Sequence, residues 1–447
     1  MTFSNDPLGQ LSDLVASAKT AGADAADAIY VEGISVSTAC RKGQPESLSR
    51  SEGYDLGLRV LIGNRQAIVS SSDLSKGALD ELVSRAVAMA KVVPEDPYCG
   101  LAPQDLLATE IPDLDDCDPV EPSGGRLEQL TAEAEDAALA VKGVTNSEGA
   151  EAGWGKSRLA VAATNGFAQE REGSGHSLSV SVVAGEGTGM ERDYDYSTAV
   201  YGEDLQSAAE LGRNAGEKAV ARLNPQKVET AQVPVIFDPR VASSLVGHLA
   251  GAINGSSVAR GTTFLKDKMG EKLFADGVQI IDDPLRIRGL HSKAFDAEGV
   301  ATQTRHLIKD GVLQTWVLDL RSARQLGLET TGNASRGTSS PPSPSTTNLY
   351  MAAGDISRDD LIGNVKSGLY ITELIGMGVN GITGDYSRGA GGYWIENGVI
   401  TYPVNEITIA GTLTEIFSNL TPASDLKFRY GTNAPTVRVD GLTLAGI

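Results

Sequence analysis

A strand followed at once by a capped helix, near the middle of the chain, constrains the fold more than any other feature of the sequence. Residues 233–237 form an apolar run, Val-Pro-Val-Ile-Phe, which predicts a buried strand. Asp238 is a favoured N-cap residue, and Pro239 at the first helical position loses no hydrogen bond. His248 lies on or beside the apolar helix face that follows, where a lone histidine is typical of a hydrogen-bonded core residue. The other members of that face recur at helical spacing: Val241, Leu245, Leu249 and Ala252.

The length and the composition place the chain among globular proteins with more than one core. At 447 residues it exceeds a single ordinary domain, and length alone predicts about three domains of ~150 residues. The 51 glycines, against 8 Phe and 3 Trp, favour turns and small-residue packing, as in β-rich architecture. The formal net charge of −20 and the lack of any Lys/Arg-rich run argue against a nucleic-acid partner.

The cysteines and the first residues bear on the cellular compartment. Cys40, Cys99 and Cys117 are widely spaced and form no Cys-x-x-Cys pair, so neither a disulfide framework nor a cysteine zinc site is indicated. Free thiols are typical of a reducing compartment. Residues 1–7 lack the pattern of a signal peptide, and no run approaches ~18 consecutive apolar residues. We therefore expect a cytoplasmic protein without a membrane partner.

The first half of the chain repeats the order helix, strands, helix. Apolar stripes with helical spacing are separated by stretches in which apolar and polar residues alternate. Gly63-Asn64 is a turn signal between two such strands, and the last helix is predicted to start near Asp204. The order predicts a bipartite α+β domain over residues 1–225. Its parts are a helix over 8–18, strands over 28–72, a helix over 79–90, a linker to about 125, a helix over 127–141, strands over 144–200 and the final helix, in subrepeats of about 1–95 and 125–225.

Residues 230–447 have a different character, with short strands and many turns. Asp310-Gly311 is a strong two-residue hairpin signal. Residues 333–347 form a long polar loop with three prolines, of a kind that is usually functional or disordered. The glycine-rich stretch 371–398 matches neither a dinucleotide fingerprint nor a phosphate loop, and indicates either a barrel corner or close approach by a bound peptide. The region predicts a β-rich, antiparallel, barrel-like C-terminal domain in a chain of the α+β class.

Five short motifs in the second half of the chain, taken in their order along the sequence, are informative. They are residues 295–300 (FDAEGV), 308–316 (IKDGVLQTW), 341–350 (PPSPSTTNLY), 384–389 (GDYSRG) and 394–398 (WIENG). Together with a looser similarity over 30–75, these blocks resemble the TldD/TldE (PmbA) peptidase family, whose old name is modulator of DNA gyrase. The resemblance covers most of the chain.

The resemblance implies a two-subunit peptidase in which the TldD subunit binds zinc through a His-Glu-x-x-x-His motif and a distant Cys. In this chain Ser243 replaces the first His, Ser244 replaces the Glu, His248 matches the second His, and Ala434 aligns with the Cys. Zinc needs about three protein ligands and an open position, and a serine pair supplies neither a strong ligand nor a general base. The chain therefore resembles TldE, and we expect no zinc, no other cofactor and no catalytic residue in it.

The same resemblance implies partners and substrates. A TldD-like subunit would hold the zinc, this chain would complete the substrate chamber, and the pair would cut unfolded or flexible peptides. Without that partner, we expect a homodimer formed through residues 233–447. The alternative is a homodimeric peptide-binding protein without catalysis, acting as a carrier or chaperone. No Gly-x-Ser-x-Gly elbow supports a serine hydrolase built on one of the 4 histidines.

A substrate peptide is expected to add as a strand beside residues 371–380, with the 333–347 loop covering it. Two acidic pairs, Asp282-Asp283 and Asp296 with Glu298, are typical of solvated turn residues rather than of a cation site. The candidate peptide-binding residues are small or polar: Gly376, Gly378, Gly381, Asp385, Ser387, Arg388 and Asn348.

Overall fold

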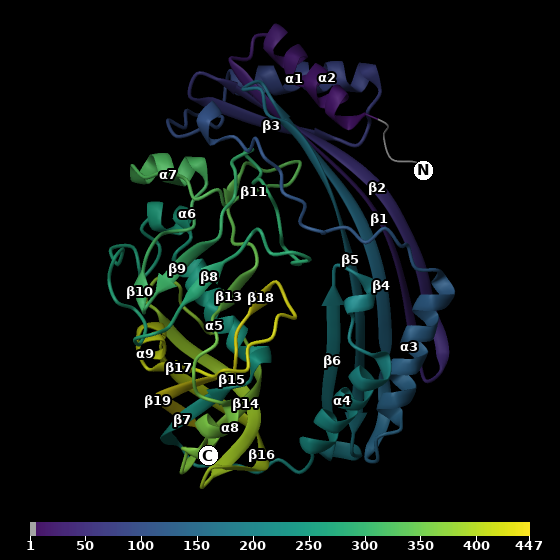
Figure 1. Cartoon of the computed structure of the whole chain (residues 1–447), viewed down its shortest axis with the longest axis vertical. Helices are drawn as coiled ribbons and strands as arrows, with labels where there is room; N and C mark the ends of the chain where they lie inside the picture. The colour runs from purple at the N-terminus through teal and green to yellow at the C-terminus, as the bar shows by residue number, and fades with distance from the viewer. Residues whose placement is uncertain (1–5) are drawn as a thin grey trace.

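A six-stranded antiparallel sheet with very long strands forms one side of the molecule (Figure 1). The computed structural model describes residues 6–447. The strand order is β3-β2-β1-β4-β5-β6, so the two helix–strand–helix repeats share one sheet through the β1–β4 contact. The expected turn at Gly63-Asn64 joins β2 to β3, and Gly63 has a φ of 55°, which favours glycine. The strands are β1 (Ala25–Arg41), β2 (Gln44–Ile62), β3 (Arg65–Ser71), β4 (Val144–Ala163), β5 (Ala168–Ala184) and β6 (Glu191–Ala199).

Helices α1 to α4 cover one face of this sheet, and the C-terminal half covers part of the other (Figure 1). Successive residues of β1 point to opposite faces of the sheet, so both faces carry apolar side chains. Tyr30 packs in the core under α1 and α2, whereas Ile29 packs on the other face in a cluster with Phe295. The last helix begins at Ala208 rather than near Asp204, because a 3₁₀ turn and an extended residue precede it. None of the described helices has both the length and the apolar character needed to cross a membrane. The helices are α1 (Pro7–Thr20), α2 (Lys76–Ala90), α3 (Gly124–Leu139) and α4 (Ala208–Ala221).

Five strands of the C-terminal half close into a barrel in the order β7-β14-β15-β16-β19, with β16 paired to β19. This confirms the expected barrel-like region and the α+β class. One contact departs from the antiparallel expectation, because β7 and β14 run parallel across a long connection that begins with helix α5. The elements are β7 (Ala231–Phe237), α5 (Pro239–Ala252), α8 (Arg358–Gly363), β14 (Ser367–Ile375), β15 (Asp385–Glu396), β16 (Val399–Thr412), α9 (Leu413–Ser418), β17 (Leu420–Pro422) and β19 (Val437–Ala445).

A smaller sheet in the order β10-β9-β8-β13-β18 packs with α5 beside the barrel. Asp310-Gly311 forms the predicted turn between β9 and β10, with φ values of 49° and 77°. The parallel β13–β18 contact adds residues near the C-terminus to this sheet as an edge strand. The elements are α6 (Gly255–Ala259), β8 (Ile280–Asp282), β9 (Arg305–Lys309), β10 (Val312–Leu313), α7 (Leu320–Leu326), β11 (Ala334–Ser335), β12 (Ser343–Pro344), β13 (Leu349–Met351) and β18 (Thr432–Asn433).

The polar loop 333–347 is fastened to the N-terminal sheet. It contains the short β11–β12 hairpin. Arg336 forms an ion pair with Asp27 of β1, and Thr338 donates a hydrogen bond to Asp55 of β2. The loop therefore joins the two halves of the molecule, and its polar contacts do not support the expected position over residues 371–380.

Three of the acidic turn residues are buried, so the expectation that they are solvated is wrong. Asp282 accepts hydrogen bonds from the backbone and hydroxyl of Thr347, at 2.6 and 2.8 Å. Asp296 accepts from the backbone N–H groups of Glu298 and Val300, at 2.9 and 3.0 Å. Burial raises the pKa of Glu298 to about 8. These carboxyl groups organise turns inside the protein, where backbone donors replace water.

Candidate functional site

Helix α5 begins where the sequence predicts, with Asp238 as its N-cap and Pro239 in the first turn. Asp238 Oδ1 accepts a hydrogen bond from the backbone N–H of Arg240 at 3.0 Å. Its Oδ2 accepts from the hydroxyl of Tyr370, on β14, at 2.6 Å. Burial and then the Asp238 charge raise the pKa of Tyr370, so the phenol stays protonated and donates. These contacts fix the start of α5 against the barrel.

The two serines aligned with the metal motif satisfy their hydroxyl groups within the helix. Ser243 Oγ donates to the carbonyl of Arg240 at 3.4 Å, and Ser244 Oγ donates to the carbonyl of Val241 at 2.6 Å. Such back-bonding to the preceding turn is usual for serine inside a helix. In these contacts neither hydroxyl forms a hydrogen bond with a histidine or a carboxylate.

His248 is half-buried on the same helix, but it is not the hydrogen-bonded core residue that we expected. Its ring packs nearly perpendicular to that of Tyr386, with ring centroids 6.0 Å apart. Its buried Nε2 has no hydrogen-bond partner in the described part of the chain. Burial and then the nearby Arg388 lower the pKa of His248, so the imidazole is neutral near pH 7.

Ala434 lines the same cavity as the first residues of α5. It follows β18, which packs against α5, and it is buried. Because α5 contacts β18, the aligned positions Ser243, Ser244 and His248 lie on an element that neighbours the one before Ala434. The residues do not fit a zinc ion, because they offer one imidazole, two hydroxyls bonded to the helix backbone, and a methyl group. Across residues 6–447, no group of three or more His, Cys, Asp or Glu side chains is arranged to hold a metal.

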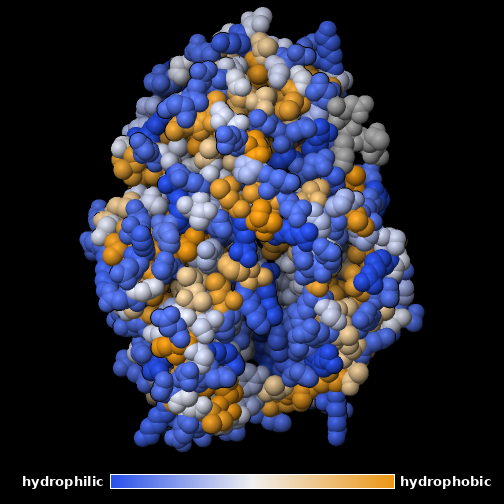
Figure 2. Space-filling view, in the orientation of Figure 1, coloured by the Kyte–Doolittle hydropathy of each residue, from blue (hydrophilic) through white to orange (hydrophobic). Residues whose placement is uncertain are grey.

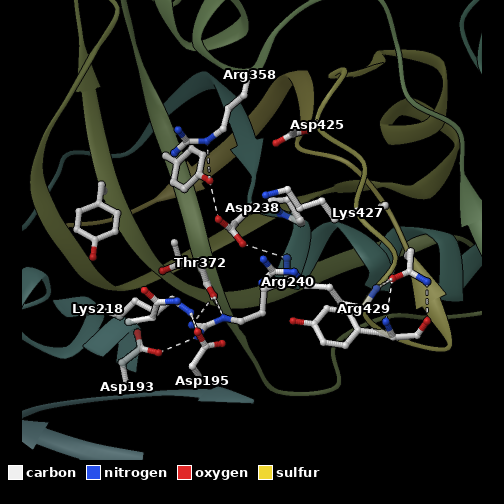
Figure 3. A pocket seen from close by; sticks show the side chains of 17 residues that line it. Asp193, Asp195, Lys218, Asp238, Arg240, Arg358, Thr372, Asp425, Lys427 and Arg429 are labelled. Carbon is white, nitrogen blue, oxygen red and sulfur yellow. Dashed lines mark hydrogen bonds and ion pairs between the residues drawn. The ribbon is translucent and has the colours of Figure 1, made fainter. Parts of the chain in front are cut away.

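The cavity beside Ala434 has a volume of about 510 Å³ and lies between the two halves of the molecule (Figure 3). Figure 2 shows a hollow with mainly hydrophilic walls between these halves. The lining side chains come from β6 and α4 on one side, and from α5, β14, β15, α8 and the segment around β18 on the other. They are Asp193, Asp195, Asn214, Lys218, Asp238, Pro239, Arg240, Arg358, Tyr370, Thr372, Tyr393, Asp425, Lys427, Arg429, Tyr430, Asn433 and Ala434.

Ion pairs in the wall of this cavity join the two halves. Arg240 lies 2.7 Å from Asp193 of β6, and Arg222 of α4's end lies 3.4 Å from the same carboxylate. Arg222 also contacts Glu373 of β14 at 2.5 Å. Burial alone would raise the pKa of Asp193, but the contacts with the two arginines outweigh it and lower that pKa. Asp193 is therefore a buried anion that holds two cations across the domain junction.

One rim of the cavity is the segment that leads into β18. Asn433 organises it, since its Oδ1 accepts from the backbone N–H groups of Arg429 and Tyr430 at 2.8 and 2.9 Å. The ring of Tyr430 stacks on Tyr196 of β6, with centroids 4.9 Å apart. Lys427 and Arg429 are exposed on this rim. The rim is thus held in place by its backbone while its cationic side chains face solvent and the cavity.

Asn348, one of the candidate peptide-binding residues, is buried and committed to the protein interior. Its Oδ1 accepts from the backbone N–H of His291 at 2.9 Å. Its Nδ2 donates to the carbonyl of Asp283 and to the hydroxyl of Ser292, both at 2.8 Å. A side-chain amide with these contacts positions two loops and has no free group for a peptide.

The remaining candidates lie on an exposed turn and at the start of β15. Gly378 packs on β15, where an added Cβ would stand 2.0 Å from the carbonyl oxygen of Ser387, whereas Gly381 faces open space. Gly376 has a φ of 81°, a turn conformation that favours glycine. Arg388 donates to the carbonyl of Ile375 at 3.3 Å. Asp385 accepts from the hydroxyl of Thr383 at 2.6 Å, so it too serves the turn.

Strand β14 has no free edge at its centre. Residues 369–371 pair with β7 on one side and β15 on the other. The next carbonyl, that of Thr372, accepts from the Arg240 side chain at 3.0 Å. An added peptide strand therefore has no place along 369–372. The exposed part of the stretch is the turn beyond it, where the side chains of Ile375, Met377 and Ile382 have exposed fractions of 58%, 93% and 62%.

Sequence reasoning missed most of the cavity lining. Asp193, Asp195 and Lys218 come from strand and helix positions with no motif around them. Arg240 was visible as part of the helix start, and Ala434 as a departure from the family pattern. No local signal pairs Arg240 with Asp193, which lies 47 residues away.

Three family models match the chain. They are described as PmbA/TldA metallopeptidase domain 1 over residues 26–90, the central domain over 113–223 and the C-terminal domain over 230–446. The metalloprotease PmbA of Escherichia coli O157:H7 is 40% identical over 97% of this chain and 94% of its own length. A metalloprotease PmbA homolog of Haemophilus influenzae is 37% identical over 96% of this chain and 94% of its own length.

Solved structures share the whole fold. A modulator of DNA gyrase from Bacteroides thetaiotaomicron superposes with a TM-score of 0.92, at 24% identity, over 100% of both chains. TldE from Thermococcus kodakarensis superposes with a TM-score of 0.84, at 19% identity, over 98% of this chain and 100% of its own. With the sequence relatives at 37–40% identity over nearly the full length, the chain belongs to the PmbA/TldD metallopeptidase family.

Proposed function

We propose that this chain is the non-metal subunit of a TldD/TldE-type zinc peptidase that degrades or processes unfolded peptides. A TldD-like partner supplies the zinc, and this chain completes the substrate chamber. The observation that carries the proposal is the set of residues at the aligned metal positions. Ser243 and Ser244 are bonded to the helix backbone, Ala434 has no donor atom, and His248 is a single imidazole.

The exposed turn of residues 375–384 supports an association with another subunit. The side chains of Ile375, Met377 and Ile382 are largely exposed on it, and clustered exposed apolar residues are common at protein–protein contacts. The same turn is compatible with the second candidate, a homodimeric peptide-binding protein without catalysis. The two candidates differ in whether cleavage appears when a TldD-like subunit is added.

Metal analysis and reconstitution test the proposal. The purified chain is expected to carry far less than one zinc per chain and to leave an unfolded polypeptide uncut. Mixed with a TldD homologue from the same genome, it is expected to co-purify and to cut that polypeptide in a chelator-sensitive manner. The control is a partner in which the first His of the His-Glu-x-x-x-His motif is replaced by Ala, which should remain bound but inactive.

Several results would contradict the proposed function. Zinc near one per chain, or chelator-sensitive cleavage by this chain alone, would overturn the assignment. Failure to bind any TldD homologue, together with a stable homodimer that binds peptides, would favour the second candidate. A genome that encodes no His-Glu-x-x-x-His homologue would point the same way.

A further inference from the structure

The walls of the 510 Å³ cavity carry more positive than negative charge, although the whole chain has a net charge of −20. Two of its aspartates are neutralised, Asp193 by Arg240 and Asp195 by Lys218 at 3.1 Å. The cavity is therefore a local basic site on an acidic protein, and a site of this kind concentrates anions. The lining has five basic side chains, Lys218, Arg240, Arg358, Lys427 and Arg429, against four acidic ones, Asp193, Asp195, Asp238 and Asp425.

The other two aspartates are already engaged as hydrogen-bond acceptors. Asp238 caps α5 and accepts from Tyr370. Asp425 accepts from the backbone N–H and the hydroxyl of Thr436, at 2.8 and 2.7 Å. Neither forms an ion pair with Lys427 or Arg429. Within residues 6–447, the side chains of those two cations have no hydrogen-bond or ion-pair partner.

The floor of the cavity holds an acceptor with spare capacity. Asp195 is 4% exposed, and its Oδ1 accepts from the backbone N–H of Tyr196 at 3.0 Å. Its Oδ2 is buried and close to Lys218, but their orientation does not form a hydrogen bond. A carboxylate oxygen has two lone pairs, so Asp195 Oδ2 can accept a ligand N–H in addition to its ion pair with Lys218. The ring of Tyr430, stacked on Tyr196, provides an apolar surface beside it.

We propose that this cavity binds a carboxylate group of a peptide. Lys427 and Arg429 hold the carboxylate, Asp195 Oδ2 accepts a main-chain N–H of the same peptide, and Tyr430 packs against the adjoining side chain. The cations Lys427 and Arg429 lie in the same cavity as the acceptor Asp195. This arrangement suits a ligand that carries a carboxylate close to an N–H donor, as the end of a peptide does. A phosphate dianion suits the cavity less, because four aspartates share its walls. The choice of a peptide rests on the proposed function.

Calorimetric titration of the full chain, without any TldD-like partner, tests the inference. Three N-acetylated hexapeptides of one sequence are compared at about 50 mM salt. The first has a free C-terminus and no acidic side chain, the second is its C-terminal amide, and the third is the amide with one internal Glu. The free acid is expected to bind at least tenfold more tightly than the plain amide. If the third peptide binds like the first, the site accepts a carboxylate from either a side chain or the C-terminus; if it binds like the second, the site accepts only the C-terminal carboxylate.

A double variant assigns the contact to the rim. Lys427→Gln with Arg429→Gln is expected to weaken binding of the preferred peptide about tenfold or more. The matched control, Arg85→Gln with Lys91→Gln, removes two exposed cations from α2 and its end, far from the cavity (Figure 1), and should bind as the native chain does. Equal binding of the free acid, the amide and the Glu amide, or native affinity in the rim variant, would overturn the inference. Cleavage by the reconstituted pair is scored separately, so failure here is distinct from failure of the proposed function.

Discussion

Replacing Asp27 by Asn should destabilise the whole chain, because Asp27 is the shared anion of a buried three-residue network. Its side chain is 5% exposed, and those of Arg59 and Arg336 are 3% and 2% exposed. Arg59 Nε donates to Asp27 Oδ2 at 2.9 Å, and Arg59 Nη2 and Arg336 Nη1 also contact the carboxylate. Arg336 belongs to the loop 333–347, so the network fastens the C-terminal half to the N-terminal sheet. The Asn variant keeps the shape but leaves two buried guanidinium groups without their anion.

The expected loss is about 3–5 kcal/mol in the free energy of unfolding, the usual cost of removing one partner from a buried ion pair. The lower end is favoured, because Glu298 interacts electrostatically with Arg59 and can ionise in its place. The charge at Asp27 also fixes the pH dependence. Burial would raise the pKa of Asp27, but Arg336 and Arg59 outweigh it and hold that pKa below its ordinary value.

A lowered folded-state pKa stabilises the folded chain above the unfolded-state pKa, which is near 3.9 for Asp, and this contribution is lost as the pH falls through the folded-state pKa. The difference between native and variant chains should therefore be full above about pH 5 and shrink in stronger acid. Urea unfolding at pH 7 and at about pH 3, below the unfolded-state pKa, measures this difference by far-ultraviolet circular dichroism. The control, Glu121→Gln, breaks an exposed pair with Arg50 at 2.6 Å and should cost far less stability than Asp27→Asn, because solvent screens the pair. An Asp27→Asn shift no larger than that of the control would refute the reasoning.

Three further predictions follow from single sites. Gly378→Val should lower the melting temperature, because a Cβ there would stand 2.0 Å from a carbonyl oxygen of β15, whereas Gly381→Val should melt as the native chain does; equal melting of the two variants would contradict the packing. Glu298→Gln should unfold like the native chain near pH 5 and be more stable than it at pH 9. Burial raises the folded-state pKa of Glu298 to about 8, so the native chain loses stability as the pH rises from the unfolded-state pKa, near 4.3, to about 8. Urea midpoints at the two pH values check this, and parallel midpoints would count against it. Finally, Ser243→His with Ala434→Cys should bind about one zinc per chain by metal analysis, because the native α5 histidine would complete three ligands; no gain over the native chain would show that the aligned positions do not converge.

Short-range features of the fold were predictable from the sequence because their hydrogen bonds join neighbouring residues. Asp238 and Pro239 start α5 through a cap that closes within two residues. Gly63-Asn64 and Asp310-Gly311 form their turns through backbone conformations that suit those residue types. The apolar spacing likewise located the strands and helices of the first half and, in the second half, β7 and α5. The loss of metal ligands at Ser243 was also visible in the sequence, because it depends only on residue type.

The tertiary structure alone decided which distant residues meet. Asp193 reaches Arg240 across 47 residues, and Asp27 reaches Arg336 across 309. Asn348 was a candidate for peptide binding, yet it is 3% exposed, and both its amide oxygen and its amide nitrogen form hydrogen bonds within the protein. Such contacts depend on how the barrel packs against the long sheet. This packing joins residues far apart in the chain, so it cannot be predicted from local sequence. The charged cavity beside α5 exists only because the two halves of the chain contribute opposite walls to it.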